Sequence, residues 1–316
     1  MRTGALNPEL RRAYRFMPAP PIARRWQRGL LRRATGLLPG PRTPAAMTYR
    51  RVDLRPGVAA HVYAPAGAEA KRGALLWIHG GGMVIGTAAQ DHRRCFGVAR
   101  ALGIVVVSAD YRLAPEHPYP APLDDCHAVW SWMLAAADEC GIDPARTAVG
   151  GQSAGGGLAA GLVQRLHDEG GLQPVAQWLF CPMLDDRTAA DRTLDRARHA
   201  VWNNRANRVG WTGYLGAEPG GEAPEYAAPA RRTDLAGLPP AWIGAGDAEL
   251  FFDEDRRYAR ALAAAGVPTE FDVVPGGPHA FESFAAGAPV SREYRARAQR
   301  WLGDRLTAAG PDASPR

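Results

Sequence analysis

Residues 146–161 read RTAVGGQSAGGGLAAG, and they indicate the architecture of the chain more directly than any other segment. RTAVGG is typical of a short buried strand, and a helix is expected from Ala154 to Asp168. Between them, Gly151 and Gly155 flank Ser153 in a Gly-x-Ser-x-Gly pattern. Because glycine carries no Cβ, the chain can turn sharply there and lift the serine hydroxyl above the strand end. This context predicts a nucleophile elbow.

Strand and helix patterns alternate on both sides of this segment. An opening hairpin is expected at RRVDLRP and AAHVYAP, further strands at ALLWIH, IVVVSAD, AQWLFCP, PAWIGAG and TEFDVVPG, and further helices over residues 91–102, 122–137, 253–265 and 291–306. Repeated β-α-β units with short turns predict an α/β protein with a parallel, doubly wound sheet covered by helices. The polar region 185–234 carries no strand signal.

Composition excludes several classes of protein. The 316 residues are 46% apolar and 22% charged, which is ordinary for a globular protein. We expect no stable membrane insertion, because no run approaches 18 apolar residues, and a cytoplasmic location, because no secretory signal is visible. The four cysteines (Cys95, Cys126, Cys140 and Cys181) lack metal-site spacing, so we expect buried thiols and no metal.

Positive charge is concentrated at the N-terminus. Residues 1–55 hold 13 arginines against Glu9 and Asp53, a net +11, so the rest of the chain carries −5 of the total +6. Such an arm could bind an acidic partner. However, apolar residues such as Tyr14 and Trp26 interrupt the arginines at roughly helical spacing. We therefore expect the arm to pack an apolar face on the protein body, and we expect no nucleic-acid partner.

A second glycine-rich motif follows the strand ALLWIH. It reads His79-Gly80-Gly81-Gly82. Acyl-transfer enzymes need backbone N–H donors about 3 Å from the carbonyl oxygen that becomes an anion. Consecutive glycines let the main chain approach that closely, so the amides of Gly81 and Gly82, with that of Ala154 after the serine, are predicted to form an oxyanion hole. His79 is expected to anchor the loop.

Three motifs together resemble one family. HGGGM, the stretch DYRLAPEHPYPAPLDD (110–125) and GQSAGG are similar to those of the hormone-sensitive-lipase-like α/β-hydrolases, the microbial carboxylesterases of family IV. The resemblance implies an α/β-hydrolase fold with a mostly parallel sheet of about eight strands, a helical cap, and a Ser-His-acid triad that hydrolyses short- to medium-chain acyl esters. Gln152 departs from the acidic or small residue that the family often has there.

The domain boundaries follow from this pattern. Residues 1–45 are expected to form an N-terminal cap arm and residues 185–235 a cap insertion. The hydrolase core would then consist of residues 46–184 and 236–316.

The general base is predicted from the position of its loop. His279 follows the last predicted strand in PGGPHAF, where an α/β-hydrolase places its histidine in the order serine, acid, histidine. His117, in the APEHPYP turn, is the other loop candidate.

Two carboxylates remain alternatives for the triad acid, in GDAELFFDED after the strand PAWIGAG. In the family that this chain resembles, the acid stands five residues before the glutamate of an Asp-Glu pair. Asp253-Glu254 is such a pair, which favours Glu249. Asp247 is closer to the strand end and has the shorter side chain that is commoner in this role.

The resulting hypothesis is a serine carboxylesterase without a cofactor. Ser153 would attack a small-molecule ester while His279 removes its proton. The candidate walls of the substrate pocket, each equally compatible with a core role, are Met83, Val84, Trp202, Trp211 and Tyr214. Lactone or amide hydrolysis on the same triad, or a non-catalytic small-molecule-binding protein of this fold, are the alternatives. The oligomeric state stays open, with a homodimer as one alternative.

Overall fold

A computed structural model describes residues 6–37, 40–67 and 71–308. Eight strands of the described chain form one sheet in the order β1-β2-β4-β3-β5-β6-β7-β8. They are β1 (Met47–Arg55), β2 (Val58–Pro65), β3 (Arg72–Ile78), β4 (Val105–Asp110), β5 (Ile142–Gln152), β6 (Ala176–Phe180), β7 (Ala241–Gly246) and β8 (Thr269–Val274). β2 runs antiparallel to β1 and β4, and the other neighbours are parallel. The predicted α/β class with a mostly parallel sheet of eight strands is confirmed.

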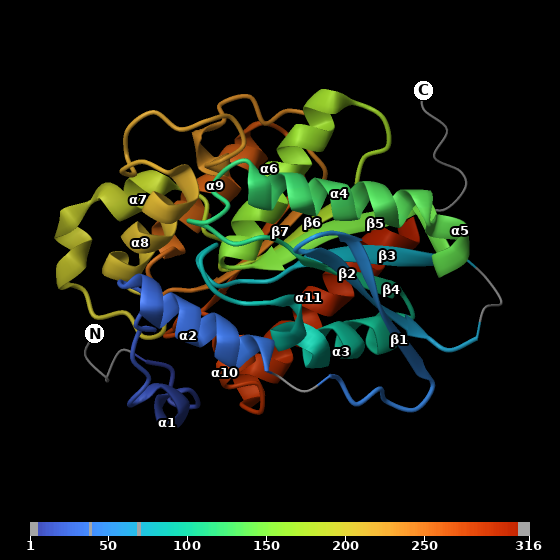
Figure 1. Cartoon of the computed structure of the whole chain (residues 1–316), viewed down its shortest axis with the longest axis horizontal. Coiled ribbons are helices and arrows are strands. Elements are labelled where there is room, and N and C mark those ends of the chain that lie inside the picture. The colour runs from blue at the N-terminus through green and yellow to red at the C-terminus, as the bar shows by residue number, and fades with distance from the viewer. Residues whose placement is uncertain (1–5, 38–39, 68–70, 309–316) are drawn as a thin grey trace.

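Helices cover both faces of the sheet (Figure 1). One face is covered by α4 (Ala121–Ala135), α6 (Ala154–Glu169) and α9 (Phe252–Ala264), and the other by α3 (His92–Leu102) and α11 (Pro289–Ala308). Successive β4 side chains alternate between two apolar clusters: Val105 and Val107 join one, and Val106 the other. All three are fully buried, which explains why a central parallel strand is a continuous run of apolar residues.

The segment between β6 and β7 is helical and irregular. Residues 181–240 are all described and contain α7 (Asp186–Ala190), α8 (Asn204–Leu215) and short 3₁₀ turns at Arg192–Arg196 and Pro229–Arg231. The remaining short elements are α5 (Ala137–Cys140), a 3₁₀ turn (Ala88–Asp91) and α10 (Phe281–Phe284).

The N-terminal arm begins as predicted. Leu10 and Tyr14, at the start and end of α1 (Arg11–Tyr14), are buried against the body. The Tyr14 hydroxyl donates a hydrogen bond to the backbone oxygen of His279 at 3.0 Å. Residues 1–5 and 38–39 of the arm lie outside the described residues.

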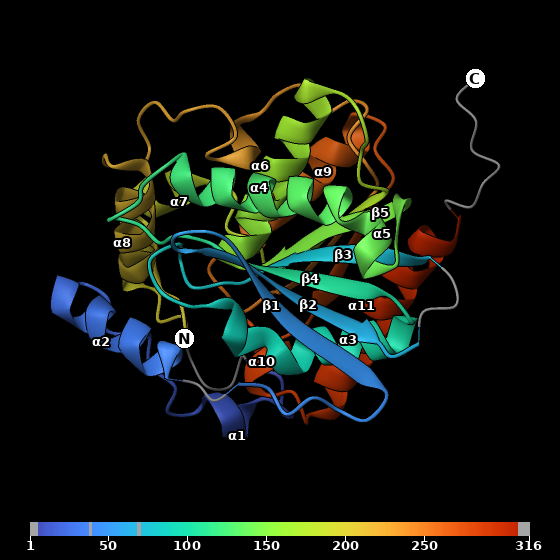
Figure 2. The same ribbon diagram turned by 45° about the vertical axis from the view of Figure 1, so that its right-hand side comes forward.

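The prediction that the arm packs an apolar face is wrong for α2 (Arg25–Gly36), which lies along the outside of the molecule (Figure 2). No residue of α2 is buried, and Trp26 and Leu30 are 62% and 61% exposed. Arg32 instead holds the helix, because its guanidinium donates to the backbone oxygens of Val84 and Ala114. Leu31 is partly buried against the apolar core, so α2 is held by polar contacts and by one leucine, whereas Trp26 and Leu30 face outward.

No helix of the described chain has the length and apolar character that a bilayer crossing requires.

Candidate active site

The sheet brings four loops to one edge, because parallel strands end at the same side. Ile78 at the end of β3 pairs with Gly151 of β5, and Gly246 at the end of β7 pairs with Val274 of β8. The loops that follow carry the candidate oxyanion glycines, the serine, the two acids and the histidine. Crevices at the carboxyl ends of strands are where α/β proteins bind ligands.

Ser153 occupies a strained turn between β5 and α6. Its φ is +56° and its ψ −122°, a conformation that typically costs about 1–3 kcal/mol. Three backbone hydrogen bonds hold it: its amide donates to Phe180 at 2.8 Å, and its carbonyl accepts from Met183 at 2.9 Å and from Gly157 at 3.1 Å. A Cβ on Gly155 would lie 2.1 Å from the backbone oxygen of Ile78. Glycine is therefore required for the helix to approach β3.

A chain of three buried side chains crosses this edge. His279 Nε2 lies 2.9 Å from Ser153 Oγ, and His279 Nδ1 lies 2.7 Å from Glu249 Oε2. Asp247 points elsewhere, since its Oδ1 accepts the backbone N–H of Gly276 at 2.6 Å. Of the two alternative acids, Glu249 is thus the one that contacts the histidine. The sequence placed both beside β7 but could not show which side chain turns toward residue 279.

The three predicted oxyanion donors are not used in backbone hydrogen bonds outside helices and strands of the described chain. Ala154 is the first residue of α6, so its N–H has no partner within the helix. Among the backbone bonds outside helices and strands in the described chain, none has the amide of Gly81 or Gly82 as donor. The N–H groups of Gly81, Gly82 and Ala154 therefore make no such backbone hydrogen bond. They follow the ends of β3 and β5, which are adjacent strands.

His79 is built into the oxyanion loop as a support. Its Nδ1 lies 2.9 Å from the Gly80 oxygen, and its ring stacks on Tyr111 with centroids 4.3 Å apart. The Tyr111 hydroxyl donates to the His79 backbone oxygen at 2.9 Å. Burial lowers the pKa of His79, which keeps the imidazole neutral inside the loop.

A polar network behind the serine was missed by the sequence analysis. Gln152, next to Ser153, donates from Nε2 to Glu282 Oε1, which also accepts from Arg94 Nη2 at 3.0 Å. The Arg94 guanidinium lies 4.9 Å from the ring centroids of both Trp77 and Phe180. Glu282 follows His279 by three residues, which weakly indicates that it lies near the site. No feature of the sequence places Arg94 there.

The predicted pocket residues are all buried in one apolar cluster. Trp202 lies directly against the oxyanion loop, because a Cβ on Gly82 would lie 2.1 Å from its indole. Trp211 and Tyr214 pack near each other on α8, with ring centroids 6.0 Å apart. Met83 and Val84 continue the glycine loop and are almost fully buried. A contact with substrate stays a prediction for all five.

A cavity of about 560 Å³ opens between the N-terminal arm and residues 195–205, and Ser153, Glu249 and His279 are not among the residues that line it. Tyr14, which bonds to the backbone of His279, lines it. His199 lines it too, and burial lowers the pKa of this imidazole. Tyr14 thus links the wall of this cavity to the backbone of His279.

One group of side chains near the triad has metal-ligand chemistry. The ligand atoms of Cys181, Glu249 and His279 lie within 4.8 Å of one another, and all three residues are buried. Burial raises the pKa of the Cys181 thiol, which disfavours the thiolate that zinc binds. His279 Nδ1 is already bonded to Glu249. The arrangement fits a triad better than a metal centre.

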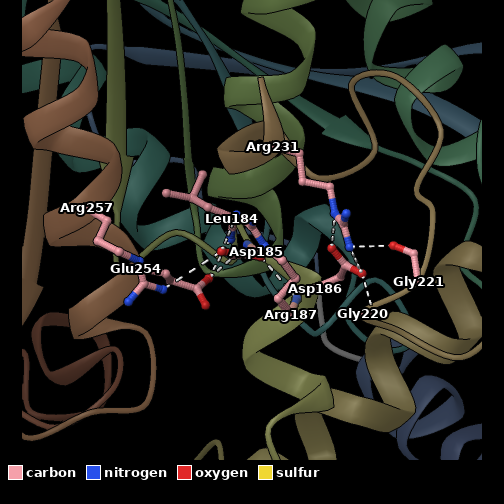
Figure 3. A network of polar contacts seen from close by, with 9 residues as sticks. All are labelled: Leu184, Asp185, Asp186, Arg187, Gly220, Gly221, Arg231, Glu254 and Arg257. Atoms are coloured by element: carbon pink, nitrogen blue, oxygen red, sulfur yellow. Dashed lines mark hydrogen bonds and ion pairs between the residues drawn. The ribbon is translucent and has the colours of Figure 1, made fainter. Parts of the chain in front are cut away.

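Buried carboxylates fasten the segment after β6 to the core (Figure 3). The amides of Leu184 and Asp185 donate to Glu254 Oε1 on α9, at 2.7 and 3.2 Å. Asp186 accepts from Arg231 at 2.6 and 2.9 Å. Asp185 accepts from Arg187, and Arg257 lies 3.8 Å from it. Residues 184–187 are thus joined to α9 through Glu254 and Arg257, and to Arg231 through Asp186.

We expect Glu254→Gln to stabilise the protein at alkaline pH. Burial raises the pKa of Glu254 from 4.5 to about 8, so the folded state holds a proton that the unfolded state loses. The Glu254 contribution to stability is therefore greatest below about pH 4.5 and falls as pH rises toward 8. Glutamine stays neutral and can still accept from the Leu184 amide.

The measurement is the free energy of unfolding of both proteins across this pH range. The variant should gain a few kcal/mol on the wild type between pH 4.5 and 8.5. Any change in the free energy of unfolding that comes from the new amide group itself should be the same at every pH. Parallel curves for the two proteins would contradict the assignment.

Comparisons with known proteins agree with this geometry. Residues 75–283 match a family described by the alpha/beta hydrolase fold. Esterase LipI of Mycobacterium tuberculosis is 34% identical over 260 residues, which cover 80% of this chain and 81% of that protein. The structure of a bacterial heroin esterase is similar with a TM-score of 0.85 and 36% identity, over 97% of this chain and 99% of that one. An esterase of the bacterial hormone-sensitive lipase family gives 0.76 and 31%, over 96% and 99%.

Proposed function

This chain belongs to the hormone-sensitive-lipase-like esterases of the α/β-hydrolase fold, and we propose that it cleaves esters with Ser153 as nucleophile, His279 as base and Glu249 as triad acid. The chain is a serine hydrolase that acts on carboxylic esters. One observation carries the assignment of residues: the continuous hydrogen-bonded path from Ser153 Oγ through both nitrogens of His279 to Glu249 Oε2, at 2.9 and 2.7 Å.

Acylation begins at the serine. Oγ bonds to the ester carbonyl carbon while its proton passes to His279 Nε2. The carbonyl oxygen becomes an anion that accepts hydrogen bonds from the amides of Gly81, Gly82 and Ala154. The tetrahedral intermediate then breaks its bond to the alcohol oxygen, which takes the proton from Nε2 and leaves.

Deacylation repeats the sequence with water. Nε2 of His279 removes a proton as the water oxygen bonds to the acyl carbon. Collapse breaks the bond to Ser153 Oγ, which recovers the proton, and the carboxylic acid leaves. Glu249 fixes the imidazole with Nδ1–H toward the carboxylate and stabilises the imidazolium that forms in both halves.

A cap over this site consists, in our proposal, of residues 1–45 and 185–235, around a core of residues 46–184 and 236–316. Tyr14 of the arm bonds to the His279 backbone, and Trp202 of the insertion lies against Gly82, which supports this division.

The acyl group would be short to medium in length, because Trp202 occupies the space above the oxyanion glycines. Its side chain is 3% exposed and has no free volume on the Gly82 side. A bulky acyl chain would have to displace the indole.

We expect Trp202→Ala to widen the range of acyl chains. Removing the indole opens space beside Gly82, so the ratio of kcat/KM for p-nitrophenyl octanoate to that for the acetate should rise at least about 10-fold. Trp202→Phe should give a smaller rise. This ratio of kcat/KM values does not depend on the fraction of folded protein. A change in it therefore reports substrate specificity and not stability. An unchanged ratio in both variants would remove Trp202 from the substrate pocket.

The proposed activity is tested with p-nitrophenyl esters from acetate to octanoate, beside lactones and anilides of matched size. Turnover restricted to the esters is expected. Faster cleavage of lactones or anilides would move the substrate class to the alternative hydrolases on the same triad.

A further inference from the structure

A second cavity, of about 680 Å³, lies between α3, α10 and α11, and Pro41, Arg42 and Pro44 of the N-terminal arm also line it. Neither Ser153 nor His279 lines it. Its walls carry six arginines from three parts of the chain: Arg42, Arg93, Arg94, Arg100, Arg292 and Arg295. Its size falls within the range of small-molecule sites, which is about 300–1,000 Å³.

The carboxylates of this cavity do not balance its positive charge. Two acidic residues line it, Asp91 and Glu282. Asp91 accepts from Trp77 Nε1 at 2.8 Å, and Glu282 is bonded to Arg94 and Gln152. Among the described residues, no carboxylate lies within 4.0 Å of the other five arginines. The cavity is therefore strongly positive.

The pKa of Arg295 also reflects the excess of positive charge in this cavity. Burial and the neighbouring charge of Arg94 lower the pKa of the Arg295 guanidinium, and Arg93 and Arg292 add to the effect. Its N–H groups donate to the backbone oxygens of Glu282 and Ala286 at 3.3 and 2.7 Å. An anion in the cavity would relieve the repulsion between these guanidinium groups.

We propose that this cavity binds a small organic phosphate with more than one negative charge. The planar guanidinium fork matches the oxygens of a phosphate group and holds them by paired, charge-assisted hydrogen bonds. Phe96, Trp178 and Phe180 line the inner wall and would face the organic part of the ligand. A dense arginine cluster beside aromatic rings suits an organic phosphate better than a simple halide.

The cavity is also connected to the catalytic serine. Arg94 and Arg295 both donate to Glu282, the first to its carboxylate and the second to its backbone. The Glu282 carboxylate accepts from Gln152, which precedes Ser153. A ligand that attracts Arg94 or Arg295 would act on the contacts from these arginines through Glu282 to Gln152, without occupying the ester site. Its effect on ester hydrolysis should therefore be noncompetitive.

Binding is tested by calorimetry on the full chain, with pyrophosphate and ATP as probes and citrate as a non-phosphate anion. Inositol trisphosphate serves as a further arm, which distinguishes a lipid headgroup from a nucleotide. We expect saturable binding of a phosphate probe below about 1 mM and weaker binding of citrate. The Ser153→Ala variant should bind equally well, so this result is independent of the proposed mechanism.

Two double variants locate the site. Arg292→Gln with Arg295→Gln, on α11, should weaken phosphate binding about 10- to 100-fold, and so should Arg93→Gln with Arg100→Gln, on α3. The matched control is Arg300→Gln with Arg305→Gln, which removes two charges from α11 outside the cavity and should bind like the wild type. Equal binding by all variants, citrate binding as tight as pyrophosphate binding, or no saturable binding of any phosphate probe would overturn the proposal.

Discussion

Ser153→Ala is expected to lower kcat for p-nitrophenyl acetate by about 10⁴- to 10⁶-fold. The substitution removes the one oxygen that lies 2.9 Å from His279 Nε2, so no acyl-enzyme can form. The oxyanion amides and the other substrate contacts remain, and they account for the slow hydrolysis that should persist above the rate in water.

The control for this change is Ser131→Ala, which alters an exposed serine on α4, away from the candidate site. It should hydrolyse the ester at the wild-type rate. Both variants should unfold at temperatures close to that of the wild type. A Ser153→Ala protein that is folded and retains more than about a tenth of the wild-type kcat would disprove the nucleophile assignment.

Glu249→Gln should lower kcat by about 10³- to 10⁴-fold, because the amide cannot stabilise the imidazolium and can hold His279 in the wrong tautomer. Asp247→Asn is the matched carboxylate-to-amide change, two residues away. It should change kcat by less than about 3-fold, because the asparagine oxygen can still accept the Gly276 N–H.

These two variants separate the alternatives that the sequence left open. Single-turnover measurements with p-nitrophenyl acetate would show whether the loss lies in acylation, where the proton first moves to His279. A large loss in Asp247→Asn with little loss in Glu249→Gln would reverse the assignment of the acid.

The strands of the core could be read from local composition because both faces of the sheet are covered. Val105, Val106 and Val107 are each fully buried although they alternate between two apolar clusters, so the strand is apolar at every position. The orientation of α2 could not be read in this way. Its apolar residues are visible in the sequence, yet only Leu31 packs partly on the core, Arg32 bonds to the Val84 backbone oxygen, and Trp26 and Leu30 face outward.

Local patterns were enough to predict the succession of strands and helices along the chain, the serine turn and the glycine loop. Each of these depends on residues that are close together in the chain. Backbone sterics act over a few residues, so glycine placement identifies a tight turn without any knowledge of the rest of the fold. The contact of Glu249 with His279 spans 30 residues, and that of Arg94 with Glu282 spans 188. Such pairs are set by the packing of whole elements, and for that reason only the folded chain decided between the two acids and brought the arginines to one cavity.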